Sequence, residues 1–293
     1  MLRAPTTDDA EAIAALFAGT RPLDAREVRS WFANPMFDPT NDFRVLERDG
    51  EVVGYADVHP EVDRLALDWI AAEEAAGHAL LDWAEDRARA EAITRLVAWA
   101  WPGSDVIESV VHARGFTPFR ASLEMQVPLD DATPAPAWPD DVSVRTVRSG
   151  EEREVHALVE EAFADANDFR PTPFEEWAAW WDDDRKRLDL WFAAEAAGSL
   201  AGVALCALDL PRGPSLGWIE TLAVRRSWRR RGLGRALLLH AFRELALVGR
   251  ATAGLSVDAE NPTGAVRLYE SAGMRPVSRR VLYEKRLSST SAL

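Results

Sequence analysis

The apolar positions in the second half of the chain follow two periods, which predicts strands and helices in a mixed order. Strands are expected at 142–147, where apolar and polar residues alternate, and at 190–195, 200–209, 216–224, 251–258 and 275–287, the last split at Ser278. Apolar residues recur every three or four positions in the segments expected to form helices, at 151–166, 174–181, 232–248 and 263–272. This order of elements predicts an α/β domain.

The first half repeats the same order of elements. Strands are expected at 43–48, 52–58, 64–70, 94–99 and 122–127, and helices at 7–17, 73–90 and 104–112. The element order matches at long period, whereas the residue identities barely match. We therefore infer an internal duplication of one α/β domain.

A stretch rich in proline and aspartate separates the two halves. Residues 128–141 contain four prolines and four aspartates. Proline removes a backbone donor and disfavours helix in the residue before it, so this stretch is expected to be extended. We expect a first domain at 1–127, a linker at 128–141 and a second domain at 142–293.

The charge distribution agrees with two domains and excludes some partners. Residues 1–140 carry 12 Arg, no Lys and 26 acidic residues, so the net charge of −14 of the whole chain lies there. This excess argues against nucleic acid or an anionic membrane as the main partner. The first residues lack the pattern of a secretory signal, and no apolar run is long enough to span a membrane. A cytoplasmic protein is expected.

Cysteine and histidine give no sign of a metal site. The single cysteine, Cys206, lies in an apolar stretch, which excludes an intrachain disulfide and a cysteine-cluster metal site. The five histidines are scattered without the spacing of metal ligands. No metal is expected.

The segment from Gly217 to Arg235 carries the most specific chemical signal. It reads GWIETLAVRRSWRRRGLGR and runs from a buried strand through a basic turn into an amphipathic helix. Gly232 and Gly234 allow a ligand to approach the backbone closely. The unpaired amides of the first helical turn attract an anion, and residues 229–231 add positive charge. The turn suits a pyrophosphate, although neither a Walker loop nor a Rossmann fingerprint is present.

A second motif, DAENPTGAVRLYESAGM, follows the next strand at 258–274. Together the pattern Arg229-x-x-Gly-x-Gly and the later Asn261…Leu-Tyr269-Glu-x-x-Gly-Met resemble the GCN5-related N-acetyltransferase (GNAT) superfamily, over roughly residues 142–287. The resemblance implies two tandem domains, each with a central mixed, mostly antiparallel sheet flanked by helices. It also implies that the fourth and fifth strands of the second copy are splayed apart. Asn261 and Tyr269 lie eight residues apart, one more than is usual in the family.

The resemblance implies that acetyl-CoA binds in this splay as co-substrate. The turn after the fourth strand would hold the pyrophosphate, the end of that strand would hold the pantetheine together with Asn261, and Tyr269 would lie beside the thioester sulfur. The expected cofactor-binding residues are Leu222, Ala223, Val224, Arg229, Arg230, Arg231, Gly232, Leu233, Gly234, Arg235, Asn261 and Tyr269.

Attack of an amine on a thioester needs a proton acceptor, a polarised carbonyl and a proton donor. Tyr269, with an ordinary pKa of about 10, is the expected donor to the thiolate. Glu220 is the expected acceptor of the amine proton, and Asp258 competes for that role or for anchoring the amine. Backbone amides of residues 222–224 would polarise the carbonyl.

The acceptor side is expected in the variable region after the first helix of the second half. Trp177, Trp180 and Trp181 fall there, and core packing competes with a role at the acceptor site. The aspartates at 182–184 either attract a cationic amine or form a solvated face.

The first half has the same order of elements but lacks the residues expected to bind CoA. Glu73 and Glu74 stand where the basic turn should be, and of its glycines only Gly77 remains. Val111 stands at the position of Tyr269. The first half therefore resembles a degenerate acetyltransferase domain, and the layout is similar to that of the mycothiol synthase subfamily.

We expect an acetyl-CoA-dependent N-acetyltransferase that modifies a primary amine of a small molecule by direct attack on the thioester. Two alternatives stay open: a non-catalytic acyl-CoA-binding or regulatory protein, and a protein N-terminal acetyltransferase. The oligomeric state stays open, although a duplicated chain can mimic a dimer as a monomer.

Overall fold

The computed structural model describes residues 1–288, with the exception of residues 22, 35, 62, 131–132, 168, 180, 182–186 and 209–212. The chain packs into two compact units. The first unit is Met1–Ser122 with Arg279–Leu293, and the second unit is Leu123–Ser278. Across the described residues, no helix is both long and apolar enough to cross a membrane.

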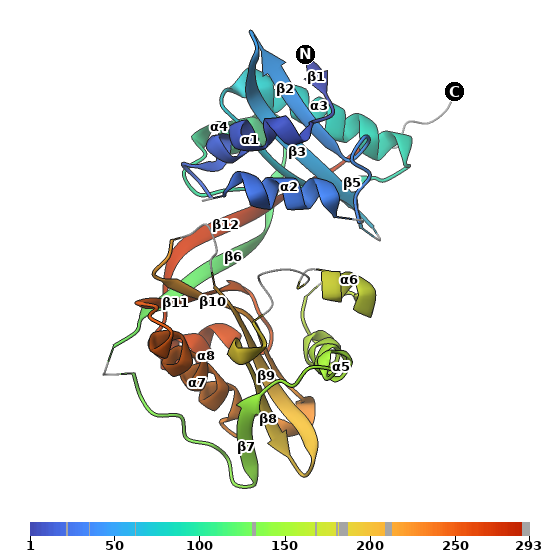
Figure 1. Ribbon diagram of the computed structural model, residues 1–293. Helices are drawn as coiled ribbons and strands as arrows, with labels where there is room; N and C mark the ends of the chain where they lie inside the picture. Colours follow the sequence, from blue (N-terminus) through green and yellow to red (C-terminus); the bar gives the residue numbers. More distant parts are fainter. Residues whose placement is uncertain are drawn as a thin grey trace. The chain divides into compact units, whose positions relative to one another are not determined.

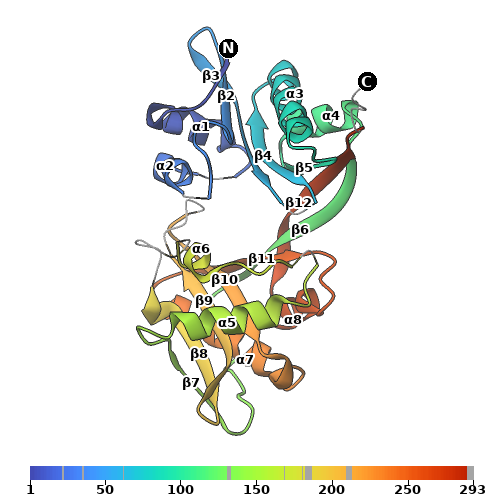
Figure 2. The ribbon, with the colours of Figure 1, turned by 90° about the vertical axis from the view of Figure 1, so that its right-hand side faces the viewer.

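In the first unit, the strands of the sheet lie in the order β1-β2-β3-β4-β5-β12. Its strands are β1 (Leu2–Arg3), β2 (Phe43–Arg48), β3 (Glu51–Pro60), β4 (Leu65–Ala71) and β5 (Arg95–Ala100), with the end of β12 (Arg275–Arg286). Its helices are α1 (Ala10–Phe17), α2 (Ala25–Ala33), α3 (Glu74–Ala90) and α4 (Asp105–Ala113), after the short helix η1 (Thr7–Asp9). Helices α1 and α2 cover one face of the sheet, and α3 and α4 cover the other (Figure 1 and Figure 2).

The second unit has the strand order β6-β11-β10-β9-β8-β7. Its strands are the end of β6 (Thr117–Pro128), β7 (Val142–Thr146), β8 (Trp191–Ala196), β9 (Ser199–Ala207), β10 (Leu216–Val224) and β11 (Thr252–Asp258). Its helices are α5 (Glu152–Phe163), α6 (Phe174–Ala179), α7 (Leu233–Leu247) and α8 (Ala265–Ser271), with the short helices η2 (Leu188–Leu190) and η3 (Arg226–Trp228). Helix α5 lies on one face of the sheet and α7 on the other (Figure 2).

Each face of the second sheet has its own apolar core. Val155 and Leu158 of α5 pack with Trp191 and Val203 on one face. Leu237 and Phe242 of α7 pack on the other face, with residues such as Cys206 and Ile219. The nearly continuous apolar runs of β8 and β9 supply both cores, because successive side chains point to opposite faces of the sheet. The expected α/β architecture of two tandem domains is confirmed.

The units differ in one respect from a division at 128–141. Strand β6 begins in the first unit and ends in the second, and β12 does the reverse. Residues 281–286 of β12 pair antiparallel with β5. The last strand of the chain therefore belongs by its pairing to the first unit.

Several elements differ from the sequence expectation, among them β1, which was not expected, and α5, which ends at Phe163 rather than at 166. Helix α2 was not expected, β6 begins at Thr117 rather than at 122, and α8 begins at Ala265 rather than at 263. Strand β12 continues through Ser278, because a polar residue does not interrupt a strand whose backbone is hydrogen-bonded to its neighbours. The predicted end of the strand at 200–209 lies outside the described residues at Asp209.

Candidate active site

Strands β10 and β11 run parallel and then separate. They pair only at Leu216–Trp218 with Thr252–Gly254. Past Trp218, no described strand pairs with the edge of β10 that faces β11, so the backbone N–H and C=O groups of this edge are available to a ligand. This is the splay that the family resemblance implied.

A β-bulge lies at the point where the strands separate. Ile219 is opposite Cys206 on β9, and Thr221 is opposite Leu205, so Glu220 is the extra residue of β10. A bulge bends its strand and redirects a side chain. Glu220 is exposed and lines the cavity that opens between the strands.

The turn after β10 presents backbone amides at the start of α7. Arg230 and Gly232 have φ of 62° and 84°, in the left-handed region, and Gly232 caps the helix. The first backbone bond of the helix runs from the Ala236 amide to the Gly232 carbonyl. The amides before Ala236 have no intrahelical acceptor, so together with the helix dipole they form a site for an anion.

The arginines of this turn divide by partner. Arg229 donates to Asp165 at 2.7 Å and to the carbonyls of Ala162 at 2.6 Å and Val224 at 3.2 Å. Arg226 also binds Asp165, at 2.5 Å. The Arg229 guanidinium therefore ties the turn to the end of α5, although the residue still borders the cavity.

Arg231 behaves differently again. Its guanidinium lies over the ring of Trp228, at 4.8 Å from the centroid. Neither Arg231 nor Leu233 lines the cavity, and Leu233 is buried in the core under α7. The side chains that the structure leaves for a ligand in this turn are Arg230 and Arg235.

The cavity has a volume of about 800 Å³ and lies within the second unit. Of the residues expected to form the site, those that line it are Glu220, Leu222, Ala223, Val224, Arg229, Arg230, Gly232, Gly234, Arg235, Asn261 and Tyr269. Others that line it include Ala162, Phe163, Asn167, Val257, Asp258, Gly264, Arg267 and Leu268. The structure thus brings the residues of the two sequence motifs together around one cavity.

Tyr269 and Glu220 border this cavity in different environments. Tyr269 is buried, and burial raises the pKa of its phenol to about 12. Burial, followed by the charge of Glu220, raises the pKa of the Cys206 thiol on the neighbouring strand. Cys206 is therefore an inert buried thiol, opposite Ile219 in the strand register.

The side chains of Asn261 and Asp258 form hydrogen bonds within the loop before α8. The Asn261 carboxamide oxygen accepts from the Thr263 amide at 2.9 Å and from the Thr263 hydroxyl at 2.5 Å. Asp258 accepts from the Glu260 amide at 2.8 Å and from the Asn167 carboxamide at 3.2 Å. The extra residue between Asn261 and Tyr269 is taken up in this loop, because α8 begins only after Gly264, whose φ is 79°. The Asn261 amide nitrogen is the group left for a ligand.

The aromatic residues of the acceptor region pack in the core. Trp181 lies edge-on to Trp191 at 4.7 Å between ring centroids, and Trp177 lies at 5.9 Å from Trp191. Both are buried, and neither lines the cavity. Trp180 and the aspartates at 182–184 lie outside the described residues.

Phe163, Asn167 and Arg267 were not singled out from the sequence. Phe163 and Asn167 lie at and just past the end of α5, and nothing in their local pattern marks them. Arg267 stands two positions before Tyr269 inside the second motif, so its place there was an available signal. Among the described residues, no group of three or more His, Cys, Asp or Glu side chains is placed to hold a metal ion.

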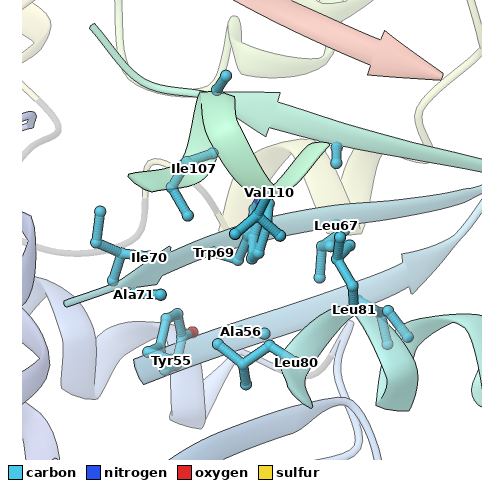
Figure 3. Close-up of a cluster of buried hydrophobic side chains, with 14 of the residues drawn as sticks. Tyr55, Ala56, Leu67, Trp69, Ile70, Ala71, Leu80, Leu81, Ile107 and Val110 are labelled. Atoms are coloured by element: carbon cyan, nitrogen blue, oxygen red, sulfur yellow. The ribbon is translucent and has the colours of Figure 1, made fainter. Parts of the chain in front are cut away.

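The corresponding region of the first unit is filled by side chains. Strands β4 and β5 also pair at only three positions and then separate, but β4 has no bulge against β3. The indole of Trp69 on β4 donates to the Trp99 carbonyl on β5 at 3.0 Å. Trp69 and Val110 are fully buried and lie within the cluster drawn in Figure 3.

The helix start that follows β4 is also occupied. Glu73 forms an ion pair with Arg48, and Glu74 accepts from the Ser109 hydroxyl at 2.6 Å. A Cβ on Gly77 would lie 3.0 Å from Val110, so this glycine serves close packing. Acidic side chains thus stand at the position of the basic turn of the second unit.

Comparisons with known proteins agree with this geometry. The model of the Acetyltransferase (GNAT) family matches residues 153–274. A mycothiol acetyltransferase from Thermobispora bispora is 34% identical over 200 residues, and the match covers 63% of this chain. It covers 64% of that relative, which is less than two thirds of its length.

Two solved structures cover nearly the whole chain. The crystal structure of a GCN5-related N-acetyltransferase from Sphaerobacter thermophilus has a TM-score of 0.76 at 32% identity, covering 99% of this chain and 98% of that one. A tandem GNAT protein from the clavulanic acid biosynthesis pathway has a TM-score of 0.76 at 18% identity and 98% coverage of both chains, which shows the shared tandem fold. With its two motifs gathered at the splay of β10 and β11, the chain belongs to the GCN5-related N-acetyltransferase family as a tandem-domain member.

Proposed function

We propose that the second unit transfers an acetyl group from acetyl-CoA to a primary amine of a small molecule. The observation that carries this proposal is the placement of Glu220 and Tyr269 in one cavity, where β10 and β11 separate. One side chain is an exposed carboxylate and the other a buried phenol, which suits a proton acceptor and a proton donor.

The residues around the cavity fit acetyl-CoA. The unpaired amides at the start of α7, with Arg230 and Arg235, suit a pyrophosphate. The unpaired edge of β10 at Leu222–Val224 suits the amides of a pantetheine arm, which would extend the sheet by backbone hydrogen bonds. Asn261 offers its amide nitrogen at the opposite side of the splay.

The protein's own groups then act on a bound thioester. Acetyl-CoA supplies an activated carbonyl carbon. Backbone amides of Leu222–Val224 polarise the carbonyl oxygen. Glu220 takes the proton of the attacking amine, and Tyr269 donates its phenolic proton to the departing thiolate. The raised pKa of Tyr269 keeps that proton in place at neutral pH.

A cationic small molecule is the acceptor class that the cavity favours. Glu220 and Asp258 are the acidic side chains among its lining residues, and they attract an ammonium group before it loses its proton. Several relatives of this chain are named mycothiol acetyltransferase. We therefore place compounds related to mycothiol in the first set of acceptors to test.

Acetyl-CoA binding is assigned to the second unit only. In the first unit, Trp69 bridges the two separating strands, and Glu73 and Glu74 stand at the helix start. Both features oppose a polyanionic ligand, one by volume and the other by charge. We propose a single CoA per chain.

Release of free CoA thiol from acetyl-CoA over a panel of amines tests the proposal. The panel contains small cationic amines, compounds related to mycothiol, and peptides with free N-termini. Release that depends on a small amine and yields the acetylated product is expected. A reaction without amine measures hydrolysis and is subtracted.

The same assay separates the alternatives. Release that depends only on peptides would favour a protein N-terminal acetyltransferase. Tight binding of acetyl-CoA with no amine-dependent release across the panel would favour a non-catalytic acyl-CoA-binding protein. Either result would overturn transfer to a small amine.

A further inference from the structure

The cavity of the second unit has three cationic side chains that the protein itself leaves unpaired. Arg230, Arg235 and Arg267 all line it, and no described residue forms an ion pair or hydrogen bond with their guanidinium groups. By contrast, Arg225, Arg226 and Arg229 are paired with carboxylates. A cavity lined by three arginines that no described carboxylate pairs is suited to more than one anionic group.

These three arginines come from two different helix starts. Arg230 and Arg235 flank the start of α7, whereas Arg267 is the third residue of α8. The guanidinium of Arg267 folds back over the N-cap, since a Cβ on Gly264 would lie 3.3 Å from its Nη2. Because glycine has no Cβ, the Arg267 guanidinium can occupy this position at the cavity wall.

The two helix starts lie against each other. A Cβ on Gly234 in the first turn of α7 would lie 3.3 Å from the Leu268 side chain of α8. Arg235 and Arg267 are the sequence neighbours of these two contacting residues. Because Arg267 lines the same cavity as Arg235, that cavity has a cationic position on α8 in addition to the proposed pyrophosphate site at the start of α7.

We propose that Arg267 forms a separate phosphate subsite that takes the 3′-phosphate of CoA. This inference rests on the proposed binding of acetyl-CoA. The pyrophosphate and the 3′-phosphate of CoA belong to the same nucleotide, so adjoining cationic positions suit the pair. A phosphomonoester carries between one and two negative charges at neutral pH and pairs with a guanidinium in a bidentate manner. The chain then distinguishes CoA from its 3′-dephospho form.

Calorimetric titration of the full chain with CoA and with 3′-dephospho-CoA tests the subsite. We expect the wild type to bind CoA about tenfold more tightly than dephospho-CoA. A tenfold difference in affinity is about what one charge-assisted hydrogen bond at a partly exposed site contributes. Arg267→Gln should lose this preference by weakening CoA alone. Arg230→Gln should weaken both ligands alike, since both carry the pyrophosphate. Arg243→Gln, on the exposed side of α7 and away from the cavity, is the matched control and should change neither.

The outcomes separate the subsite from the proposed function. Equal affinity of the wild type for the two ligands would overturn the subsite while leaving acetyl-CoA binding in place. So would equal weakening of both ligands by Arg267→Gln. If the wild type bound neither ligand, the proposed function would fall and the subsite with it.

Discussion

At the scale of single residues, the candidate site depends on a buried phenol and an exposed carboxylate. Tyr269 has 8% of its surface exposed, whereas Glu220 is open to the cavity. Burial disfavours the phenolate, so the Tyr269 hydroxyl remains a donor across the physiological range. The Glu220 carboxylate is exposed at the cavity, where an approaching ammonium group can reach it. These two environments support the proposed roles of Tyr269 as proton donor and Glu220 as proton acceptor.

Replacement of Tyr269 by Phe removes the hydroxyl and keeps the ring that packs in the core. We expect turnover to fall by roughly 10²–10⁴-fold, the usual contribution of a positioned acid. The affinity for acetyl-CoA should stay nearly unchanged, as measured by calorimetry. Unaltered turnover in a folded Tyr269→Phe protein would return Tyr269 to a packing role.

The first unit has its own unusual acid, Asp57 on β3. Its carboxylate accepts from the Tyr55 hydroxyl at 3.0 Å and lies opposite Asp68 in the strand register. Burial, followed by the charge of Asp68, raises the pKa of Asp57 to about 7. Arg21 and His59 are the nearby cations, and they only partly offset these effects.

Asp57→Asn should therefore stabilise the protein at high pH. The folded chain holds a proton that the unfolded chain releases above about pH 4, so stability falls as the pH rises from about 4 to about 7. The variant lacks this loss and keeps an acceptor for Tyr55. We expect a gain of about 4 kcal/mol in the free energy of unfolding at pH 8, from about three pKa units, and less than about 1 kcal/mol at pH 4. Urea unfolding at both values measures it, and an equal gain at both would contradict the assignment.

At the scale of elements, the sequence predicts regular segments well and their interactions poorly. Helix α3 was expected at 73–90 and runs from Glu74 to Ala90, because its apolar period is long and regular. Helix α2 was missed, although Asp24 accepts from the Glu27 amide at 2.8 Å in a recognisable N-cap pattern. The bulge at Glu220 left no mark in the sequence, since it depends on the register with β9.

The same distinction applies to the basic turn. The spacing of the six arginines between 225 and 235 suggested that they act together in binding an anion. Their actual partners come from distant positions, such as Asp165 at the end of α5 for Arg226 and Arg229. Only tertiary structure separates arginines that hold the turn from those that face the cavity.

Glu85 joins three elements of the first unit. From α3 it accepts from Lys285 on β12 at 2.7 Å, from Arg114 after α4 at 3.0 Å and from Arg89 at 2.7 Å. Its side chain is 5% exposed. Burial acts to raise the pKa of Glu85, but hydrogen bonds from Lys285 and Arg114 outweigh it and hold the pKa below its usual value. The stability it contributes is present at neutral pH and is lost as the pH falls through that lowered pKa.

Glu85→Ala should lower the free energy of unfolding by about 2 kcal/mol at pH 7, because it leaves three cations without their shared partner. Asp86→Ala is the matched control, since Asp86 pairs with Arg89 from a side chain that is 78% exposed. That change should stay within about 0.5 kcal/mol. Equal losses in the two variants would show that Glu85 has no special role.

At the scale of the whole molecule, the two sequence repeats and the two packed units do not coincide. Strands β6 and β12 each leave the unit in which they begin. The order of elements along the chain predicted the duplication, because the helices and strands of each repeat are recognised from local sequence patterns. The pairing of β12 depends on a distant strand, because Arg286 lies opposite Arg95 on β5. No local sequence pattern therefore showed that β12 crosses into the first unit.

This exchange predicts where the chain can be cut. A fragment of residues 142–278 lacks β6, whose Met125 is fully buried in the core beneath α7 together with Leu123 and Val127. It also loses the bond from the Leu129 amide to the Ala251 carbonyl at 2.8 Å. A fragment of residues 123–278 keeps both. Loss of such a core residue costs about 2–5 kcal/mol.

We therefore expect the 123–278 fragment to unfold cooperatively and to bind one acetyl-CoA, and the 142–278 fragment to unfold at a clearly lower temperature. Calorimetric scans with and without acetyl-CoA compare the two, and Met125→Ala in the longer fragment isolates the core contribution. Equal stability of both fragments would mean that β6 is dispensable to the second unit. The pairing of β6 beside β11 would then be incidental to the cavity that β10 and β11 enclose.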